Sequence, residues 1–495
     1  MSARRTSLQL ALLGGDAVVF LASGIVLYVL MSHVAGSELL GQYTLVMSWM
    51  LVFQSFGSFG IPELLMRELG RFPEERGIHL GAGLIVGTLA SAAAMPVMML
   101  ASRYAGYDSV LQHALVIAAL SLPGAMLLNV ARSGLIACHR IEFVFATRLF
   151  EFLAVLPLNI VLLLRGHGIE VLTAVLVAGR ATSGLLGLLL LHRRAFRVTW
   201  WPGRAALQAL LSPAKTFAAG NSLGLIGTHL NVIMLSLMAP VAAVGHYGAG
   251  YKLIESLTLA TVLFGQFYMP KIAHSLTTRR GHGLEPFRAP FGLLFAVTMP
   301  VGVGLVLFSE SIVKLVFGPD FVETITVLHL MGVFYLVCCF DALLSMVLKA
   351  ASLQRLDLAI MSSSPLVNGL VNLALIPQFG AVGAAAGLLA SSLCSATLRY
   401  IFVTRRIGTP GWLTLAAPWA ILSLSFGGAI VLWGASFSPW VQVLLYALLV
   451  LGMMASAARA AVVAATANSA RDNAMHGDDS EPAAQTRYST GDPKR

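Results

Sequence analysis

The residues of this sequence most able to do chemistry are charged side chains inside apolar stretches long enough to cross a bilayer. A charge at the bilayer centre costs about 2.5–3.5 kcal/mol on insertion scales, so such residues are functional candidates by default. Guanidinium and ammonium groups can hold phosphate, and an intramembrane carboxylate can carry a coupling ion. Six residues of this kind interrupt the apolar stretches, with Asp16 nearer the start of the first: Arg148, Arg180, Lys252, Glu63, Glu255 and Asp341.

Some of these charges have an opposite charge three or four residues away. Side chains at this spacing share one face of a helix and can neutralise each other. The sequence therefore leaves two interpretations open for each pair, a structural ion pair or a binding group. The pairs are Glu63 with Arg67, Arg148 with Glu151, and Lys252 with Glu255.

Arg180 and Asp341 have no such partner in their own helices. Arg180 lies near the middle of a stretch beside Gly179 and Gly184, and small neighbours permit close helix packing and leave room for a long side chain. We therefore rank Arg180 first among the binding candidates. The alternative is that Arg180 and Asp341 pair with each other across the molecule.

The elements that must position these residues are about fourteen apolar stretches of roughly 20 residues, the length that crosses a hydrocarbon core as a helix. We predict an all-α, polytopic membrane bundle. The predicted spans are 15–35, 43–65, 80–101, 109–130, 143–164, 169–191, 217–239, 241–268, 289–309, 323–348, 357–377, 380–402, 412–434 and 439–463.

Lys and Arg alternate between successive gaps of this series. One set of gaps holds nearly all of them, whereas the opposite set offers only Arg103, Arg165 and Lys314. Because cytoplasmic loops retain basic residues, this pattern predicts an inner-membrane protein with both termini in the cytoplasm.

Composition agrees with this prediction, since 57% of residues are hydrophobic and 11% charged. The net charge of +10 is explained by attraction to anionic lipid at the cytoplasmic rim, so no nucleic-acid partner is expected. The four cysteines show no metal-ligand spacing, and we predict neither a metal nor a cofactor. No extracytoplasmic loop is long enough to form a substrate-holding domain, so an enzyme is not expected.

An internal repeat divides the chain. Gly41-Gln42-Tyr43 opens the second span and Gly245-His246-Tyr247 opens the eighth, which predicts two pseudo-symmetric six-helix lobes with a site between them. The predicted segments are an N-terminal lobe (1–191), an interfacial cytoplasmic linker (192–216), a C-terminal lobe (217–406), two further helices (407–464) and a disordered, dispensable cytoplasmic tail (465–495).

Four stretches resemble a known family, over most of residues 10–405. The second span resembles the "YG…fGl…R" region of oligosaccharide flippases, ending at Arg67. The eighth span, from Val244 to Glu255, is similar to their "vG.Y..a.kl.e" run, and the stretch 316–321 resembles their "fG..f". The most specific match is the run from Asn368 to Gly383, which resembles "N..ln..liP..G..GAA".

This resemblance implies a Wzx-type polysaccharide transporter in the superfamily that also holds multidrug exporters and the lipid II flippase. We expect a flippase that moves polyprenyl-pyrophosphate-linked oligosaccharide, with membrane lipids, a polysaccharide polymerase and glycosyltransferases as candidate partners. Its candidate substrate-binding residues are Arg180, Arg148, Lys252 and Arg67, and its candidate ion-coupling residues are Asp341 and Glu255.

Two alternatives remain at this point. One is a cation-coupled multidrug exporter, whose cavity should be net acidic, and the other is a non-transporting scaffold of a polysaccharide-synthesis complex. The chain has Asn231 where many members of the family have an acidic residue, so no counter-ion role is assigned there. Polar residues that could contact sugars are Asn221, His229, Asn231 and Gln266.

Overall fold

The computed structural model describes residues 3–278, 284–433, 438–456 and 459, and all regular structure in these ranges is helical. The first half contains α1 (Ala3–Ser58), α2 (Ile61–Arg71), α3 (Arg76–Tyr104), α4 (Ser109–Ala119), α5 (Ser121–Ala137), α6 (Ile141–Leu164), α7 (Ile169–Arg194) and α8 (Arg204–Met238). The second half contains α9 (Val241–Leu257), α10 (Leu259–Thr278), η1 (Glu285–Phe287), α11 (Arg288–Leu307), α12 (Ser309–Val316), α13 (Val322–Ala350), α14 (Gln354–Arg406), α15 (Trp412–Trp433) and a last helix (Pro439–Ser456).

The protein is a multi-pass membrane protein. Ten helices in the described ranges are long and apolar enough to cross a bilayer, and large apolar side chains cover the outside of the bundle. Leu366, Leu370 and Leu373 of α14, for example, are all well exposed and share one helix face. Such a face is stable in hydrocarbon, so the predicted all-α membrane bundle is confirmed.

Two of the long helices are broken at glycine. Gly36 in α1 has φ 74° and Gly380 in α14 has φ 51°, in the left-handed region that favours glycine. Gly36 falls between two predicted spans and Gly380 is the first residue of the predicted span 380–402, so α1 and α14 are each a pair of helices joined at a kink. The total of fourteen crossings stays a prediction.

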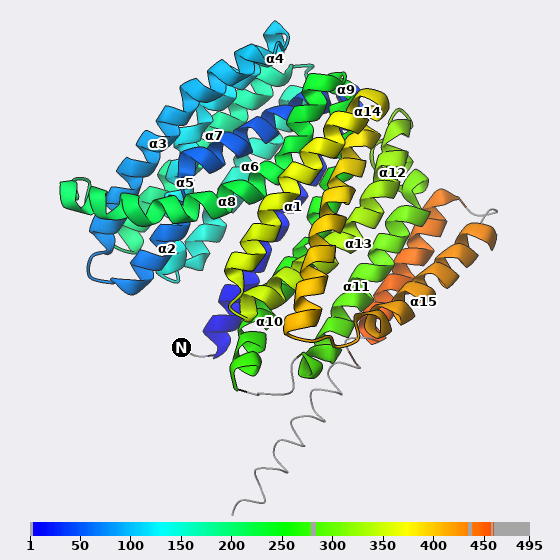
Figure 1. Cartoon of the computed structure of the whole chain (residues 1–495). Helices are drawn as coiled ribbons and strands as arrows, with labels where there is room; N and C mark the ends of the chain where they lie inside the picture. Colours follow the sequence, from blue (N-terminus) through cyan, green and yellow to red (C-terminus); the bar gives the residue numbers. More distant parts are fainter. Residues whose placement is uncertain (1–2, 279–283, 434–437, 457–458, 460–495) are drawn as a thin grey trace, which may run out of the picture.

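The helices form two groups in Figure 1, α2–α7 on one side and α9–α14 on the other, with parts of α1 and α8 running between them. α1 packs against α3 and α6 of the first group and against α9 of the second. α8 packs against α3 and also against α14. The predicted lobe boundaries agree with this grouping in outline but stay a prediction.

The linker differs from the sequence-based expectation. α7 extends to Arg194 and α8 begins at Arg204, then continues without interruption to Met238. The segment expected as an interfacial linker, 192–216, therefore includes the end of α7 and the first part of α8. The backbone of α8 continues the helix because 204–216 contains no glycine, and the one proline of this range, Pro213, is tolerated within α8. The predicted tail, 465–495, lies outside the described residues.

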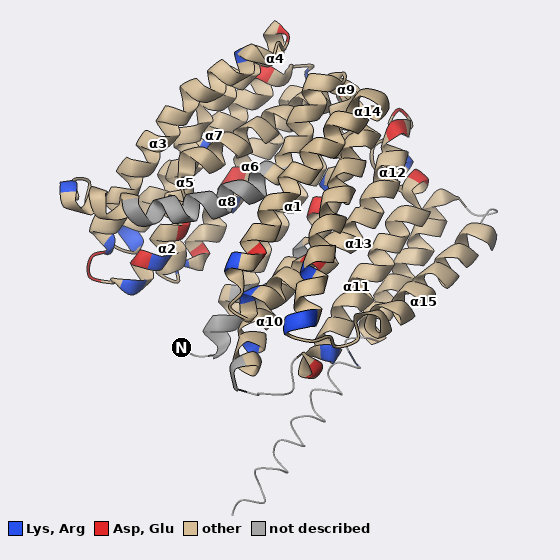
Figure 2. Ribbon diagram, viewed as in Figure 1, with Lys and Arg blue, Asp and Glu red and all other residues tan. Residues whose placement is uncertain are grey.

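The two ends of the bundle differ in how the core is built. We call the end with Gly36 and Gly380 the kink end, and the end with Arg71, Arg140 and Arg406, where basic residues gather in Figure 2, the basic end. At the kink end one apolar cluster runs through both groups, from Leu40 in α1 to Ala381 in α14. Toward the basic end each group has its own core, the first including Leu65, Leu80, Leu135 and Leu191, the second including Phe291, Val347, Ile360 and Val403.

The repeated glycines meet where the groups join. A Cβ added to Gly41 would lie 2.1 Å from the carbonyl oxygen of Val241, and one added to Gly245 would lie 2.0 Å from that of Ser37. The backbones of α1 and α9 are thus in direct contact at matching positions of the repeat. This contact supports the predicted pseudo-symmetry, because each repeat places its glycine against the other.

Candidate functional site

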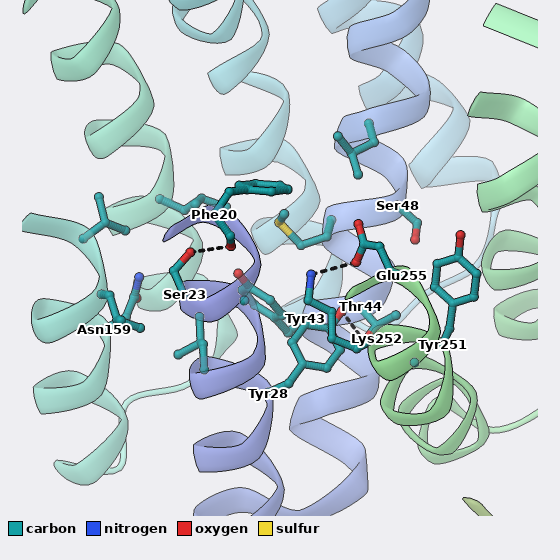
Figure 3. Close-up of a pocket in the computed structure, with 18 of the residues that line it drawn as sticks. Phe20, Ser23, Tyr28, Tyr43, Thr44, Ser48, Asn159, Tyr251, Lys252 and Glu255 are labelled. Atoms are coloured by element: carbon teal, nitrogen blue, oxygen red, sulfur yellow. Dashed lines mark hydrogen bonds and ion pairs between the residues drawn. The ribbon is translucent and has the colours of Figure 1, made fainter. Parts of the chain in front are cut away.

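A cavity of about 360 Å³ lies between α1, α6, α7, α8 and α9. Aromatic rings form much of its wall, and Figure 3 shows Phe20, Tyr28 and Tyr43 around it. Thr44 donates a hydrogen bond of 3.1 Å to the Tyr28 hydroxyl, and the Tyr28 and Tyr43 rings meet edge to face at 5.8 Å. The α1 contribution comes from both sides of its kink, so the cavity is placed well inside the bundle.

The cavity brings together four of the six predicted site residues. Arg148 of α6, Arg180 of α7, and Lys252 and Glu255 of α9 all line it. These residues are far apart in sequence and come from both helix groups. The lining also includes Glu151, which gives three basic and two acidic side chains in all.

Arg148 is held by one carboxylate of its own helix, Glu151, and by another on α1, Asp16. Its Nη1 donates to Glu151 Oε2 at 2.9 Å, and its Nε lies 3.5 Å from Asp16 Oδ1. Asp16 also pairs with Arg132 at 2.6 Å, and the Arg148 guanidinium lies 4.7 Å from the centroid of the Phe20 ring. The pairing with Glu151 that the sequence spacing suggested is confirmed, and the extra contacts fix the guanidinium at the cavity wall.

Arg180 makes weaker contacts with the protein than Arg148 does. Its Nη1 donates a long hydrogen bond of 3.4 Å to Gln54 Oε1, and no carboxylate in the described part of the chain forms an ion pair with it. A Cβ on Gly179 would lie 2.1 Å from Val155 Cγ2, so this neighbour allows α7 to pack closely on α6. Arg180 is therefore a lightly engaged guanidinium facing a cavity, with donors available to a ligand.

Lys252 reaches from the second helix group into a notch on α1. A Cβ on Gly24 would lie 2.6 Å from Lys252 Cε and 2.7 Å from its Nζ, so a larger residue at position 24 would displace the end of this side chain. The ammonium lies 5.8 Å from the Phe20 ring centroid and 5.5 Å from that of Tyr28, within cation–π range. It also donates to Glu255 at 2.8 Å, as Figure 3 shows, which confirms the second predicted pair.

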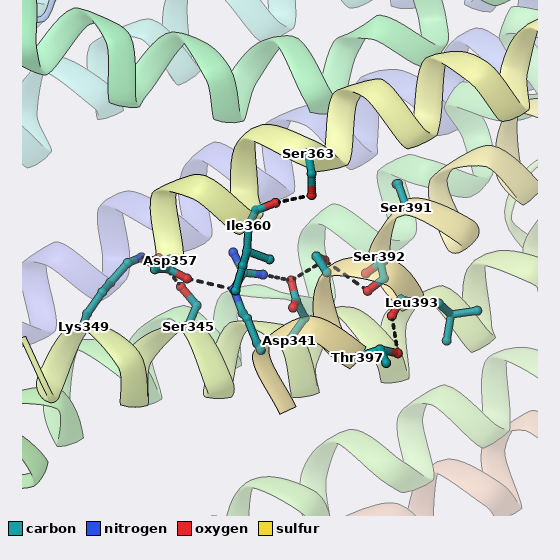
Figure 4. Close-up of polar contacts among 12 residues, drawn as sticks. Asp341, Ser345, Lys349, Asp357, Ile360, Ser363, Ser391, Ser392, Leu393 and Thr397 are labelled. Carbon is teal, nitrogen blue, oxygen red and sulfur yellow. Dashed lines mark hydrogen bonds and ion pairs between the residues drawn. The ribbon is translucent and has the colours of Figure 1, made fainter. Parts of the chain in front are cut away.

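Asp341 lies in a different place. It forms an ion pair with Arg399 of α14 and accepts a hydrogen bond from Ser395 at 3.2 Å. Figure 4 shows the network continuing to Asp357, whose Oδ1 accepts from Arg399 Nε at 2.8 Å. The alternative pairing of Asp341 with Arg180 is therefore wrong, because Asp341 pairs with a guanidinium of the neighbouring helix instead.

Arg67 also lies outside the cavity. It is on α2 near the basic end, its side chain is 50% exposed, and its Nη2 lies 2.6 Å from Glu68. The structure gives it no place among the groups that line the site.

Sequence reasoning missed several members of these two clusters. Arg399 falls inside the predicted span 380–402, and Asp357 stands at the first position of the span 357–377. Arg399 could have been identified as a residue of opposite charge to Asp341 within another predicted span. Phe20 and Tyr28 carried no signal beyond being aromatic within a span, whereas Glu151 was predicted as the partner of Arg148.

The residues predicted to contact sugars do not all line the cavity. His229 lines the cavity and its Nδ1 lies 3.2 Å from Ser48 Oγ. Asn231 is fully buried and does not line the cavity, because its amide donates to the Tyr247 hydroxyl at 3.0 Å and accepts from Asn372 at 2.6 Å. The side chains of Asn221 and Gln266 lie outside the described residues.

The most specific motif serves packing. Asn372 and Asn368 of α14 donate to Asn231 and to the Gly227 carbonyl of α8, at 2.6 and 3.3 Å. A Cβ on Gly387 would lie 2.1 Å from Asn372 Oδ1, so this glycine makes room for the amide. The two asparagines thereby tie α8 to the first half of α14, and Gly387 lets the second half pack against them.

Solved structures share this fold at low sequence identity. A structure of the lipid II flippase MurJ in an inward closed conformation matches with a TM-score of 0.72 and 13% identity, covering 92% of this chain and 99% of that one. An inward-facing multidrug resistance MATE family transporter matches with a TM-score of 0.62 and 14% identity, over 79% and 94% of the two chains. The MATE multidrug transporter DinF-BH matches with a TM-score of 0.60 and 16% identity, over 82% and 95%. No curated protein matches the sequence.

A family model described as "Polysaccharide biosynthesis protein" matches residues 15–274. This range includes the second and eighth spans, whose motifs carried the resemblance, and every helix that lines the cavity. The resemblance to polysaccharide transporters is thereby confirmed. Since the match covers more than half of its length, the chain belongs to the polysaccharide biosynthesis protein family.

Proposed function

We propose that the protein is a flippase that moves a polyprenyl-pyrophosphate-linked oligosaccharide from the cytoplasmic to the periplasmic leaflet of the inner membrane. The observation that carries this proposal is the convergence of Arg148, Arg180 and Lys252 on one cavity from two helix groups. A pyrophosphate carries several acceptor oxygens and negative charge, and both guanidinium and ammonium groups bind it well.

The charge of the lining favours an anionic cargo. Three basic side chains face two acidic ones, and Arg180 has no carboxylate partner among the described residues. A cation-coupled multidrug exporter, the alternative from sequence, needs a net acidic cavity for its cargo. A scaffold that transports nothing gives no reason to keep charged groups around an internal space, since each is costly in a membrane.

The two ends of the bundle support movement by alternating access. The helix groups share a core at the kink end but have separate cores at the basic end. Parting the groups at the basic end therefore disturbs fewer shared contacts than parting them at the kink end. With the basic end in the cytoplasm, as Lys and Arg distribution predicts, cargo would load from the side on which it is made.

The membrane potential favours the proposed direction. Outward movement of negative charge in an inside-negative cell gains about 2.3 kcal/mol per charge per 100 mV. A net negative cargo needs no further coupling to be driven outward, although Glu255 beside Lys252 remains a candidate for ion coupling.

Proteoliposomes provide the test. A fluorescent short-chain polyprenyl pyrophosphate-linked saccharide is placed in both leaflets, and its transfer is followed by quenching from outside. The natural protein should accelerate transfer, and an inside-negative potential should raise the rate toward the face that corresponds to the periplasm. Equal rates with protein and with empty liposomes would contradict the proposal.

A further inference from the structure

A second cavity, of about 340 Å³, adjoins the first. It lies between α9, α10 and α13, and it shares Tyr251 and Glu255 with the cation-lined cavity. Figure 3 shows both residues on α9 beside Lys252. We call this second space the side chamber. The rest of its lining comprises Ile254, Thr258, Thr261, Val262, Gly265, Phe334, Cys338, Cys339 and Ala342.

The surface of the side chamber is apolar despite its two threonines. The Thr258 hydroxyl donates to the Glu255 carbonyl at 2.8 Å, and the Thr261 hydroxyl donates to Cys339 Sγ at 3.2 Å. Both hydroxyls are thereby satisfied within the protein. The charged group in the lining, Glu255, is already paired with Lys252. An anionic headgroup would be repelled by this carboxylate and finds no cation in the lining, whereas a neutral hydrocarbon chain fits.

We propose that the side chamber holds the isoprenyl segment nearest the pyrophosphate while the headgroup occupies the main cavity. This inference rests on the proposed function and names the second half of its binding site. Because the chain is covalently attached to the pyrophosphate, its first units must lie in an apolar space that borders the cation cluster. Lipid is itself apolar, so the side chamber selects by shape and proximity more than by hydrophobicity.

Photolabelling locates the chain. The full-length protein in phosphatidylethanolamine nanodiscs is irradiated with farnesyl pyrophosphate that carries a diazirine in its isoprenyl chain, and labelled residues are mapped by mass spectrometry. Label should appear on Phe334, Cys338 or Ala342 and should disappear with excess unlabelled farnesyl pyrophosphate. Label confined to lipid-facing residues would overturn the proposal, as would equal labelling of these positions by a diazirine phosphatidylcholine.

Filling the side chamber with a larger side chain tests whether the protein can lose affinity for the isoprenyl chain and keep affinity for pyrophosphate. Ala342 is exposed and lines the chamber, so Ala342→Phe should weaken binding of farnesyl pyrophosphate about tenfold and leave that of inorganic pyrophosphate unchanged. Val333→Phe is the matched control, because Val333 is exposed on the same helix but lies outside the lining. Equal farnesyl pyrophosphate affinity in all three proteins would overturn the proposal.

The outcomes distinguish this inference from the proposed function. One outcome is that Arg180→Gln abolishes pyrophosphate binding while Ala342→Phe changes nothing. This result would support the headgroup site and exclude the side chamber as the isoprenyl site. No binding of either ligand to the natural protein would remove both. If Ala342→Phe weakens both ligands, the photolabelling decides, since label on α13 sustains the side chamber and its absence there excludes it.

Discussion

Two clusters of charge lie within the helices of this protein, and they differ in what surrounds them. In the cavity cluster, Arg148 and Lys252 face an open space, and their side chains are 17% and 12% exposed. In the α13–α14 cluster, Arg399 and Asp357 are 5% and 1% exposed and pair directly. The comparison teaches that a charge within a span does not by itself locate a binding site. Space beside the charge, and donors left over for a ligand, distinguish the two cases.

The α13–α14 cluster is well matched internally. One guanidinium joins two carboxylates, Asp341 and Asp357, and Asp357 also accepts from Ser345 and lies 3.5 Å from Lys349. Asp357 and Arg399 belong to different halves of α14, so the network fastens both halves to α13. Its role in this arrangement is to hold helices together, and the predicted ion-coupling role of Asp341 remains to be tested.

The largest effect is expected from Arg399→Gln, which tests whether the α13–α14 cluster holds these helices together. Arg399→Gln leaves two buried carboxylates without their shared partner, which typically destabilises a protein by about 3–5 kcal/mol. We expect protein abundance and thermal stability in detergent to fall sharply. Arg405→Gln, an exposed change on the same helix, is the control. Normal abundance with loss of transport would instead assign Asp341 and Arg399 to coupling.

The next effect tests the cavity cluster. Arg180→Gln removes charge-assisted hydrogen bonds worth about 1.5–3 kcal/mol to a bound anion, so cargo affinity should fall by about 10–150-fold. Arg180→Lys should retain part of it. Protein abundance should stay unchanged, because within the described part of the chain Arg180 makes one long hydrogen bond, to Gln54, and no ion pair. Flipping at the natural rate by well-expressed Arg180→Glu would exclude Arg180 from the site.

A smaller effect should come from the notch beneath Lys252. Gly24→Ala places a methyl group where Lys252 now lies, and the flexible side chain must move. We expect cargo binding to weaken several-fold, because the ammonium loses its position between Phe20 and Tyr28. Gly14→Ala on the same helix is the control, since nothing lies within 4 Å of its added Cβ. Matching affinities in the two variants would show that the notch does not position Lys252 for cargo.

The smallest effect is expected at Arg67. The Arg67 side chain is half exposed in its pair with Glu68, and ion pairs open to solvent contribute about 0–1 kcal/mol. Arg67→Gln should flip cargo at close to the natural rate in the same proteoliposome assay. A loss comparable with that of Arg180→Gln would return Arg67 to the site and indicate a second binding position near the basic end.

Sequence analysis predicted much of the fold and of the candidate site. What it could not predict depends on how the helices pack against one another. Hydropathy and periodicity predicted the helices, and spacing within one helix predicted Arg148 with Glu151 and Lys252 with Glu255, since such pairs depend only on helix geometry. The pairing of Asp341 with Arg399 could not be predicted in this way, because it depends on how α13 and α14 pack. Depth in a span placed Arg180 among the candidates, but its exposure to a cavity required the neighbouring helices.

The glycine contact between α1 and α9 has a consequence for what a sugar would meet. Main chain meets main chain where Gly41 lies on Val241 and Gly245 on Ser37, so at these two points parting of the helices would separate backbone from backbone. The surfaces uncovered would be peptide carbonyls, and each carbonyl oxygen has a second lone pair beyond the one used in its helix. Under the proposed function, a saccharide passing between them would meet these hydrogen-bond acceptors among the apolar side chains of the shared core.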